Sequence, residues 1–320
     1  MSAAVLQRCK SKLQFLFGIG AAIYLLLPIV GFSHSTAHAR EKWHREGGNA
    51  IAGPEDMQNI DIVSLGGTQF RAYYMKSGQV YSALSEDDGK SFTEEGARFA
   101  GNHFAALKLP SGQVRIYYTD FETGDLLSKI SDDGLDFTDE EGIRLSASEE
   151  GIVHPSVITL SDGTYRMYFD VKISENSNKG PGFGQKMKSA SSTDGLAWTL
   201  DNGVRIKLRQ RGLPSSADMV FSPFAIYDEE SGKFKLYMTV EDNKKKKKSG
   251  VYLATSKNGL RFEILPKAVL GIDPEVSNPA SSEYGLTGNP QDVFIITTSD
   301  GSKLMYVWQA EQGYILAVPE

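Results

Sequence analysis

The feature that most constrains the fold is a short pattern that recurs five times along the chain. Each copy is a strand-like run that ends in a tyrosine followed by an apolar or second aromatic residue. The copies are Phe70–Tyr74, Val114–Tyr118, Tyr165–Phe169, Phe234–Met238 and Lys303–Val307. A unit that repeats in this way cannot bury its apolar face alone, so the pattern predicts several like units stacked around a shared core.

A predicted tight turn precedes each copy. The turn before the copy contains an Asp-Gly pair in two cases, Ser161–Thr164 and Ser299–Gly301, and glycine accepts the positive φ that such hairpins need. A second turn follows four of the copies, with a serine shortly before an Asp-Gly or Asn-Gly pair and an aromatic residue after it. These turns are Ser85–Phe92, Ser131–Phe137, Ser192–Trp198 and Ser256–Phe262. We expect the serine and Asp or Asn side chains to cap the turn backbone.

These patterns predict an all-β chain built from four-stranded antiparallel units. Such units repeated radially are the blades of a β-propeller, and we therefore predict a five-bladed β-propeller over residues 56–320. We place the blades at about 56–100, 101–148, 149–211, 212–271 and 286–320. The fifth unit has room for only three strands. We expect the lead-in segment 40–55 to add the fourth strand and close the ring, which removes an exposed sheet edge.

The first 39 residues have the pattern of a signal peptide. Arg8, Lys10 and Lys12 precede an apolar run, and Ala37–Ala39 then fits the A-x-A site of signal peptidase. An uncleaved anchor is the alternative, because about 20 apolar residues can span a bilayer. We expect the chain to contact a membrane only if this N-terminal segment is not cleaved. In both cases the folded part lies outside the cytoplasm, so we predict a secreted or periplasmic protein.

Composition excludes several classes of function. The formal net charge is −6, and an acidic balance argues against a nucleic-acid partner held by phosphate contacts. Cys9 is the only cysteine, and it precedes the apolar run. The folded part therefore has no disulfide, no thiolate metal site and no cysteine nucleophile.

The repeated turns, each after a paired-aromatic strand, resemble those of the arabinanase, β-xylosidase, invertase and levansucrase clan of five-bladed glycosidases. The Ser85–Phe92 turn also resembles the Asp-box of sialidases. This resemblance covers essentially the whole chain after the signal segment. It implies a site on the upper face of the propeller, around the axis, with an oligo- or polysaccharide as partner. In that clan three carboxylates act there: an Asp in blade 1, an Asp before proline in blade 3 and a Glu acid in blade 4. Glycoside hydrolysis needs paired carboxyl groups because one donates a proton while the other attacks or activates water.

Counting back an equal distance from the paired aromatic of each blade gives one residue at the start of each inner strand. In blade 4 the count allows for a longer turn. These residues are Asn59, His103, His154, Ser222 and Asp292. His154 precedes Pro155 and stands where the clan has an Asp, while Phe221 stands at the position of the acid Glu. Asp56 supplies the blade-1 Asp only if the alignment shifts by three residues. The clan's three-carboxylate set is therefore not evident.

Acidic residues in the loops on the same face are further candidates: Asp120, Glu122, Asp170, Asp218, Glu241 and Asp242. Our leading hypothesis is an extracytoplasmic carbohydrate-active propeller, of the glycoside-hydrolase type, with a rearranged active site. One of Asp170, Asp218 and Glu241 would donate the proton, and His154 would complete the catalytic group. The expected substrate contacts are Asn59, His103, Asp120, Asp292 and Trp308, the last as a sugar-stacking platform.

Two other functions remain open at this stage. One is a non-catalytic propeller that binds a glycan or a protein on the same face, which the missing blade-4 Glu favours. The other is a metal-assisted hydrolase that uses His103 and His154, since histidines near a carboxylate can bind a divalent metal. We expect no cofactor, although a divalent cation in the central channel is compatible with the axial residues. These residues can also simply solvate the channel.

Two further patterns have simple structural explanations. Arg71, Arg115 and Arg166 are similar to the arginine triad with which sialidases hold a carboxylate, but they recur at one strand position, which predicts a structural role. The loop Asn243–Ser249 contains five consecutive lysines. We predict a mobile, solvated loop there, with an anionic partner or glycan gating as the alternatives.

Overall fold

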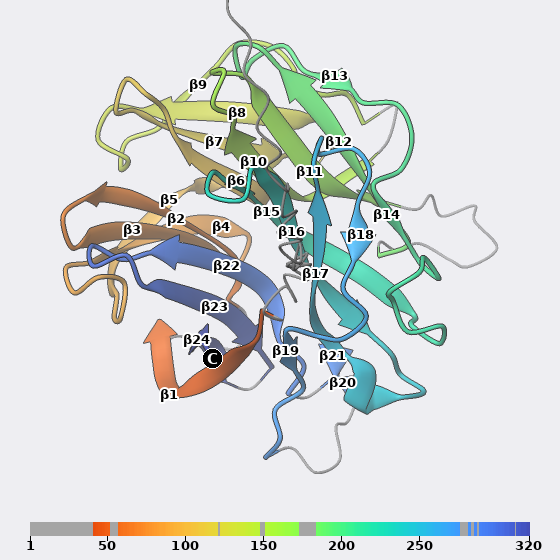
Figure 1. Ribbon diagram of the computed structural model, residues 1–320. Coiled ribbons are helices and arrows are strands. Elements are labelled where there is room, and N and C mark those ends of the chain that lie inside the picture. Colours follow the sequence, from red (N-terminus) through yellow and green to blue (C-terminus); the bar gives the residue numbers. More distant parts are fainter. Residues whose placement is uncertain are drawn as a thin grey trace, which may run out of the picture. The chain divides into compact units, whose positions relative to one another are not determined.

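Each predicted unit folds as one antiparallel sheet in the computed structural model (Figure 1). The structure describes residues 41–51, 57–120, 122–147, 151–172, 184–275, 281–282, 285–286, 288–310 and 312–320. The predicted signal segment and Asp56 lie outside the described residues. Among the described residues, no helix is both long and apolar enough to cross a membrane.

The first two blades are regular four-stranded sheets. Blade 1 consists of β2 (Gln58–Gly66), β3 (Gln69–Lys76), β4 (Gln79–Ser85) and β5 (Thr93–Ala100). Blade 2 consists of β6 (Asn102–Lys108), β7 (Val114–Thr119), β8 (Leu126–Ser131) and β9 (Thr138–Asp139).

Blades 3 and 4 have a split outer edge, in which two short strands pair with the third strand. Blade 3 consists of β10 (Gly151–Thr159), β11 (Tyr165–Lys172), β12 (Lys186–Ser192), β13 (Thr199–Leu200) and β14 (Ile206–Lys207). Blade 4 consists of β15 (Met219–Asp228), β16 (Lys233–Glu241), β17 (Gly250–Ser256), β18 (Glu263–Ile264) and β19 (Leu270–Gly271). A single 3-10 turn, η1 (Lys246–Lys248), lies between β16 and β17.

Blade 5 joins the two ends of the folded chain. It consists of β22 (Gln291–Thr297), β23 (Lys303–Gln309), β24 (Gly313–Pro319) and the N-terminal β1 (Trp43–Ile51). Figure 1 shows β1 beside β24, near the marked C-terminus. A two-stranded hairpin, β20 (Ser281–Ser282) and β21 (Gly285–Leu286), precedes β22. The prediction that the N-terminal segment supplies the missing strand is confirmed.

The inner strands form a closed ring. β2 contacts β6, β6 contacts β10, β10 contacts β15, β15 contacts β22, and β22 contacts β2 again. This order confirms the predicted five-bladed β-propeller. Each inner strand thus has a neighbouring blade on both sides, which suits a protein whose stability must come from packing alone.

The repeated tyrosine of the sequence pattern holds each blade to the next. The Tyr117 hydroxyl of blade 2 donates to the Gly195 carbonyl in the turn of blade 3 at 2.8 Å. The ring of Trp198, which follows that turn, meets Tyr117 edge to face, with 5.6 Å between centroids. The same contact recurs from Tyr73 to Gly134, from Tyr168 to Gly259 and from Tyr306 to Gly89.

The turns themselves are capped by their own side chains, as predicted. Ser192 Oγ accepts the Gly195 N–H at 2.9 Å and donates to Asp194 at 3.0 Å, and Asp194 Oδ1 accepts the next two backbone N–H groups. In blade 5 the outer strand comes from the N-terminus and has no such turn. At the joint between blades 4 and 5, the equivalent tyrosine of blade 4, Tyr237, therefore donates to Glu41, just before β1.

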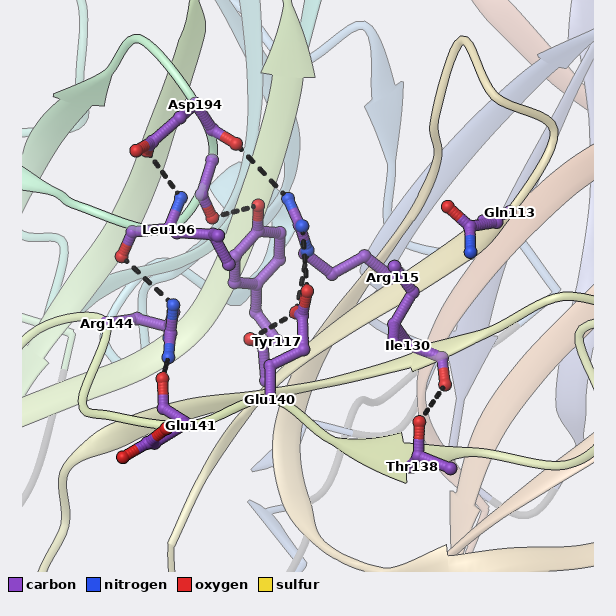
Figure 2. A network of polar contacts seen from close by, with 12 residues as sticks. Gln113, Arg115, Tyr117, Ile130, Thr138, Glu140, Glu141, Arg144, Asp194 and Leu196 are labelled. Atoms are coloured by element: carbon purple, nitrogen blue, oxygen red, sulfur yellow. Dashed lines mark hydrogen bonds and ion pairs between the residues drawn. The ribbon is translucent and has the colours of Figure 1, made fainter.

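The repeated arginines tie the same joints together. Figure 2 shows Arg115 between Glu140 of its own blade and the Asp194 carbonyl of blade 3, with Arg144 reaching the Leu196 carbonyl. The Arg115–Glu140 contact is bidentate, at 2.7 and 2.8 Å. Arg71 and Arg166 make the corresponding contacts with the turns of blades 2 and 4. These contacts bear out the structural role predicted for the three arginines.

Candidate functional site

Five equivalent residues at the starts of the inner strands share an unusual backbone conformation. Their φ angles are between 42° and 49°, in the left-handed region that residues other than glycine seldom adopt. They are Asn59, His103, His154, Ser222 and Asp292, the residues found above by counting back along the repeat. Each lies where the register of its inner strand pair shifts. Such bulges re-aim a side chain, and the strain of about 1–3 kcal/mol at each residue is typical of functional sites.

A chain of hydrogen bonds links four of these residues, together with Asp170, across four blades. His154 Nδ1 lies 2.9 Å from Asp170 Oδ2, and the same oxygen accepts the Ser222 N–H at 2.9 Å. Ser222 Oγ donates to Asp292 Oδ1 at 2.5 Å, and Asp292 Oδ2 accepts the Asn59 N–H at 3.4 Å. The chain therefore runs from blade 3 through blades 4 and 5 to blade 1. We call the five hydrogen-bonded residues the axial network: Asn59, His154, Asp170, Ser222 and Asp292.

Two aromatic neighbours fix the position of His154. The His103 ring meets the His154 ring edge to face, with 4.6 Å between centroids, and the Phe221 ring lies 6.3 Å away on a tilted plane. The two histidines of the metal hypothesis are thus in contact. In the described part of the chain, however, no group of three ligating side chains is arranged to hold a metal ion.

The electrostatics favour a protonated His154. Burial lowers its pKa, but the hydrogen bond and charge of Asp170, together with the charge of Asp292, outweigh burial and raise the pKa above its ordinary value. Burial raises the pKa of Asp170, and the bond to His154 opposes that rise. Since Asp170 holds Nδ1, the ring presents Nε2 on its opposite edge.

The space on the axis is too small for a sugar. The cavity lined by Asn59, His154, Ser222 and Asp292 has a volume of about 30 Å³, which is the room occupied by roughly one water molecule. A ligand larger than a water molecule would therefore have to bind at the opening of the channel beside the axial network, which we call the axial mouth. The channel widens on the other side to about 470 Å³.

Asp61 lines both cavities and marks the boundary between them. Its Oδ2 accepts the Ala106 N–H at 2.5 Å, and burial raises its pKa well above the ordinary value. Sequence reasoning missed this residue. Side chains alternate along a strand, so the position two residues after Asn59 on the same face was a signal that could have identified it.

His103 contacts the axial network through its ring, whereas two other predicted substrate contacts, Asp120 and Trp308, lie apart from it. Asp120 Oδ1 accepts the N–H groups of Glu122 and Thr123 and the Thr123 hydroxyl, which lowers the pKa of Asp120 and closes a local turn. Trp308 is only 2 % exposed and lies in the apolar core around blades 5 and 1. Trp308 therefore presents no open surface for a sugar in this structure, whereas Asp120 is partly exposed.

Asp218 and Glu241, the other two predicted proton donors, make hydrogen bonds to a loop. Asp218 Oδ2 accepts the Asn243 N–H at 2.7 Å, and Glu241 Oε1 accepts from the Asn243 side-chain amide at 3.3 Å. Both bonds hold the start of the loop between β16 and β17. Of the four predicted catalytic residues, the structure therefore brings together His154 and Asp170 and places Asp218 and Glu241 at this loop.

Comparison with known proteins identifies the fold. No family model matches the sequence, and no curated protein matches it either. Among solved structures, the endo-arabinase of Bacteroides thetaiotaomicron VPI-5482 matches with a TM-score of 0.60 and 11 % identity, over 82 % of this chain and 92 % of that one. An endo-1,4-beta-xylanase of the same organism matches with a TM-score of 0.56 and 15 % identity, over 82 % and 89 %. An N-acetylgalactosamine deacetylase from F. plautii, in complex with blood group B trisaccharide, matches with a TM-score of 0.57 and 13 % identity, over 86 % and 91 %.

The chain therefore has the five-bladed propeller fold of carbohydrate-active enzymes, at low sequence identity. The deacetylase shows that this fold is not limited to one reaction on sugars. Activity must accordingly be argued from the residues of the site.

Proposed function

We propose that the chain is a carbohydrate-cleaving hydrolase of the glycoside-hydrolase type, which acts on a sugar chain bound above the axial network. The observation that carries the proposal is the hydrogen-bonded path from His154 through Asp170 and Ser222 to Asp292. It brings an imidazole with a raised pKa and a carboxyl group to the lining of one axial cavity. The fold shared with arabinan- and xylan-named enzymes supports a carbohydrate substrate.

The two groups can divide the chemistry of glycoside hydrolysis between them. His154 donates the proton on Nε2 to the leaving-group oxygen while the glycosidic C–O bond breaks. Asp292 accepts a proton from the attacking water, whose oxygen bonds to the anomeric carbon, and the proton later returns to His154 through solvent. In this scheme a histidine donates the proton in place of the clan's carboxylic acid. It differs from the sequence-based expectation, in which one of Asp170, Asp218 and Glu241 was the proton donor.

Asp170 acts through His154 in this proposal. Its side chain is fully buried, and Oδ2 is engaged with His154 and the Ser222 N–H, so it does not reach a substrate. It fixes the orientation of the ring and keeps the imidazole protonated. We therefore assign Asp170 as a positioning residue and no longer as one of the candidate proton donors.

A non-catalytic glycan-binding propeller is the second candidate, and one observation favours it. Phe221, which stands at the position of the clan's acid Glu, is only 5 % exposed and packs beside His154. The clan's acid is then absent from this position, as a binding propeller allows. Location outside the cytoplasm is part of both proposals and is supported by the signal pattern of residues 1–39.

Released sugar measured on a panel of oligosaccharides and aryl glycosides tests the proposal. We expect hydrolysis by the wild type, and losses of about 100-fold or more in His154→Gln and Asp292→Asn. Asp162→Asn is the matched control, because its carboxylate accepts only from Thr164 in the turn between β10 and β11, and we expect it to keep full activity. Binding without hydrolysis across the panel would replace the hydrolase with the binding propeller. Loss of activity in EDTA would instead support the metal-assisted alternative.

A further inference from the structure

The loop between β16 and β17 concentrates positive charge on an acidic protein. Lys244–Lys248 are consecutive, whereas the whole chain carries a formal charge of −6. Four of the five side chains are exposed: Lys244, Lys245, Lys247 and Lys248. None of the ion pairs in the described part of the chain includes any of these four. Their charges therefore face solvent and are available to a ligand.

The backbone of this loop is held in one shape by a buried carboxylate. Asp242 is fully buried, and its Oδ1 accepts the N–H groups of Lys244 at 3.1 Å and Lys245 at 2.7 Å. Its Oδ2 accepts from the Ser216 hydroxyl at 2.5 Å. Burial of a carboxylate is costly unless hydrogen bonds compensate it. The lysine side chains are solvated, as predicted from the sequence, and hydrogen bonds support the backbone that carries them.

The far end of the loop is also anchored. The Asp242 N–H donates to Ser249 Oγ at 2.8 Å, and the Tyr252 hydroxyl donates to the Lys248 carbonyl at 2.8 Å. Between the two anchors the chain makes the single 3-10 turn η1. A backbone ordered in advance loses less entropy when its side chains bind a ligand. The loop is thus built to present its lysines.

The loop lies at the same end of blade 4 as the axial network. Glu241, the last residue of β16, pairs with Met219, the first residue of β15, and Ser222 follows three residues later. Asp218 and Glu241, both near this junction, hold Asn243 at the start of the loop. The lysine loop therefore begins at the face on which the proposed substrate would bind.

From these contacts we infer that the lysine loop binds the anionic groups of an acidic glycan, such as uronate carboxylates or sulfates, on a sugar chain that extends from the axial mouth. This inference rests on the proposed function, because it names the substrate class of that site. Ammonium groups attract such anions as point charges. An extended anionic surface, such as a membrane or a nucleic acid, is repelled by the net negative protein, whereas one glycan chain can follow a narrow cationic track.

Binding measured apart from hydrolysis tests the inference. Calorimetry with oligogalacturonate, and with neutral xylo-oligosaccharide for comparison, is run on the full chain between about 50 and about 200 mM NaCl. One variant changes the four exposed loop lysines to glutamine. The matched control makes the same change at four exposed lysines elsewhere: Lys90, Lys207, Lys257 and Lys267. It removes the same net charge without touching the loop.

We expect the wild type to prefer the acidic oligosaccharide, and added salt to weaken that binding. The loop variant should lose about tenfold or more in affinity, and the control variant should lose less than about twofold. Equal losses in the two variants, or equal binding of acidic and neutral sugars by the wild type, would overturn the inference. So would tighter loop-dependent binding to phosphatidylserine vesicles or to DNA than to the glycan.

The two proposals fail in distinguishable ways. Loop-dependent binding of oligogalacturonate without any hydrolysis would remove the hydrolase proposal and leave the inference intact. Hydrolysis of a neutral glycan that is lost in His154→Gln and unchanged in the loop variant would support the hydrolase proposal and overturn the inference about the loop.

Discussion

Replacement of Gly195 by alanine should destabilise the propeller at the joint between blades 2 and 3. Gly195 has a φ of 73°, and an added Cβ would lie 2.6 Å from Arg115 Nη1 and 2.9 Å from Tyr117 Oη. Alanine in this left-handed conformation costs about 1–2 kcal/mol. Displacement of the Tyr117 hydroxyl leaves a buried donor without its partner, which costs about 1–3 kcal/mol more. We therefore expect a total loss of about 2–5 kcal/mol in the free energy of unfolding.

Gly163→Ala separates the two contributions. Gly163 has a φ of 83°, but an added Cβ would meet no other atom within 4 Å, so only the backbone cost of about 1–2 kcal/mol applies. Urea unfolding followed by tryptophan fluorescence measures both variants against the wild type. If Gly195→Ala is no more destabilising than Gly163→Ala, the tyrosine-to-turn contact does not hold the blades together and this reasoning fails.

Three further predictions concern the site, the ring and the location of the protein. The raised pKa of His154 stabilises the fold fully below pH 6.5, its ordinary value, and this contribution is lost as the pH rises through the folded pKa. Asp170→Asn should lower that pKa in an NMR titration of the imidazole and flatten the pH dependence; an unchanged His154 titration would contradict the pairing. A chain shortened to begin at Asp56 lacks β1 and should unfold at a much lower urea concentration than one that begins at Arg40, and equal midpoints would show that β1 does not close the ring. Expression of the full chain followed by cell fractionation should place it outside the cytoplasm, and recovery in the cytoplasmic fraction would contradict the signal-peptide prediction.

The fold was predictable because its determinants are local and repeated. The Ser192–Trp198 turn and its three relatives specify hairpins within a few residues, and the recurring tyrosine sets the spacing of the blades. The gap in the fifth unit was visible in the same spacing, which is why the pairing of β1 with β24 could be predicted.

The axial network was predictable only in part. Equal spacing along the repeat found all five strand-start residues, because a propeller brings equivalent positions to one axis. The bond between His154 and Asp170 joins residues of two strands, and the bond from Ser222 to Asp292 joins two blades. Such contacts depend on bulge geometry and on the angle between blades, which no local pattern contains. For the same reason the sequence did not predict that Trp308 lies in the apolar core. Trp308 is near the end of its strand, at the position that Asp170 has in blade 3.

The roles of His154 and Asp292 are tested most directly by the dependence of hydrolysis on the leaving group. A dinitrophenyl glycoside needs little protonation to depart, whereas an alkyl or sugar leaving group needs a general acid. We predict that His154→Gln loses about 100-fold or more on the unactivated substrate and nearly nothing on the dinitrophenyl glycoside, while Asp292→Asn is impaired on both. Equal losses of His154→Gln on the two substrates, or no hydrolysis of either by the wild type, would contradict the central claim that the axial network is an acid–base site.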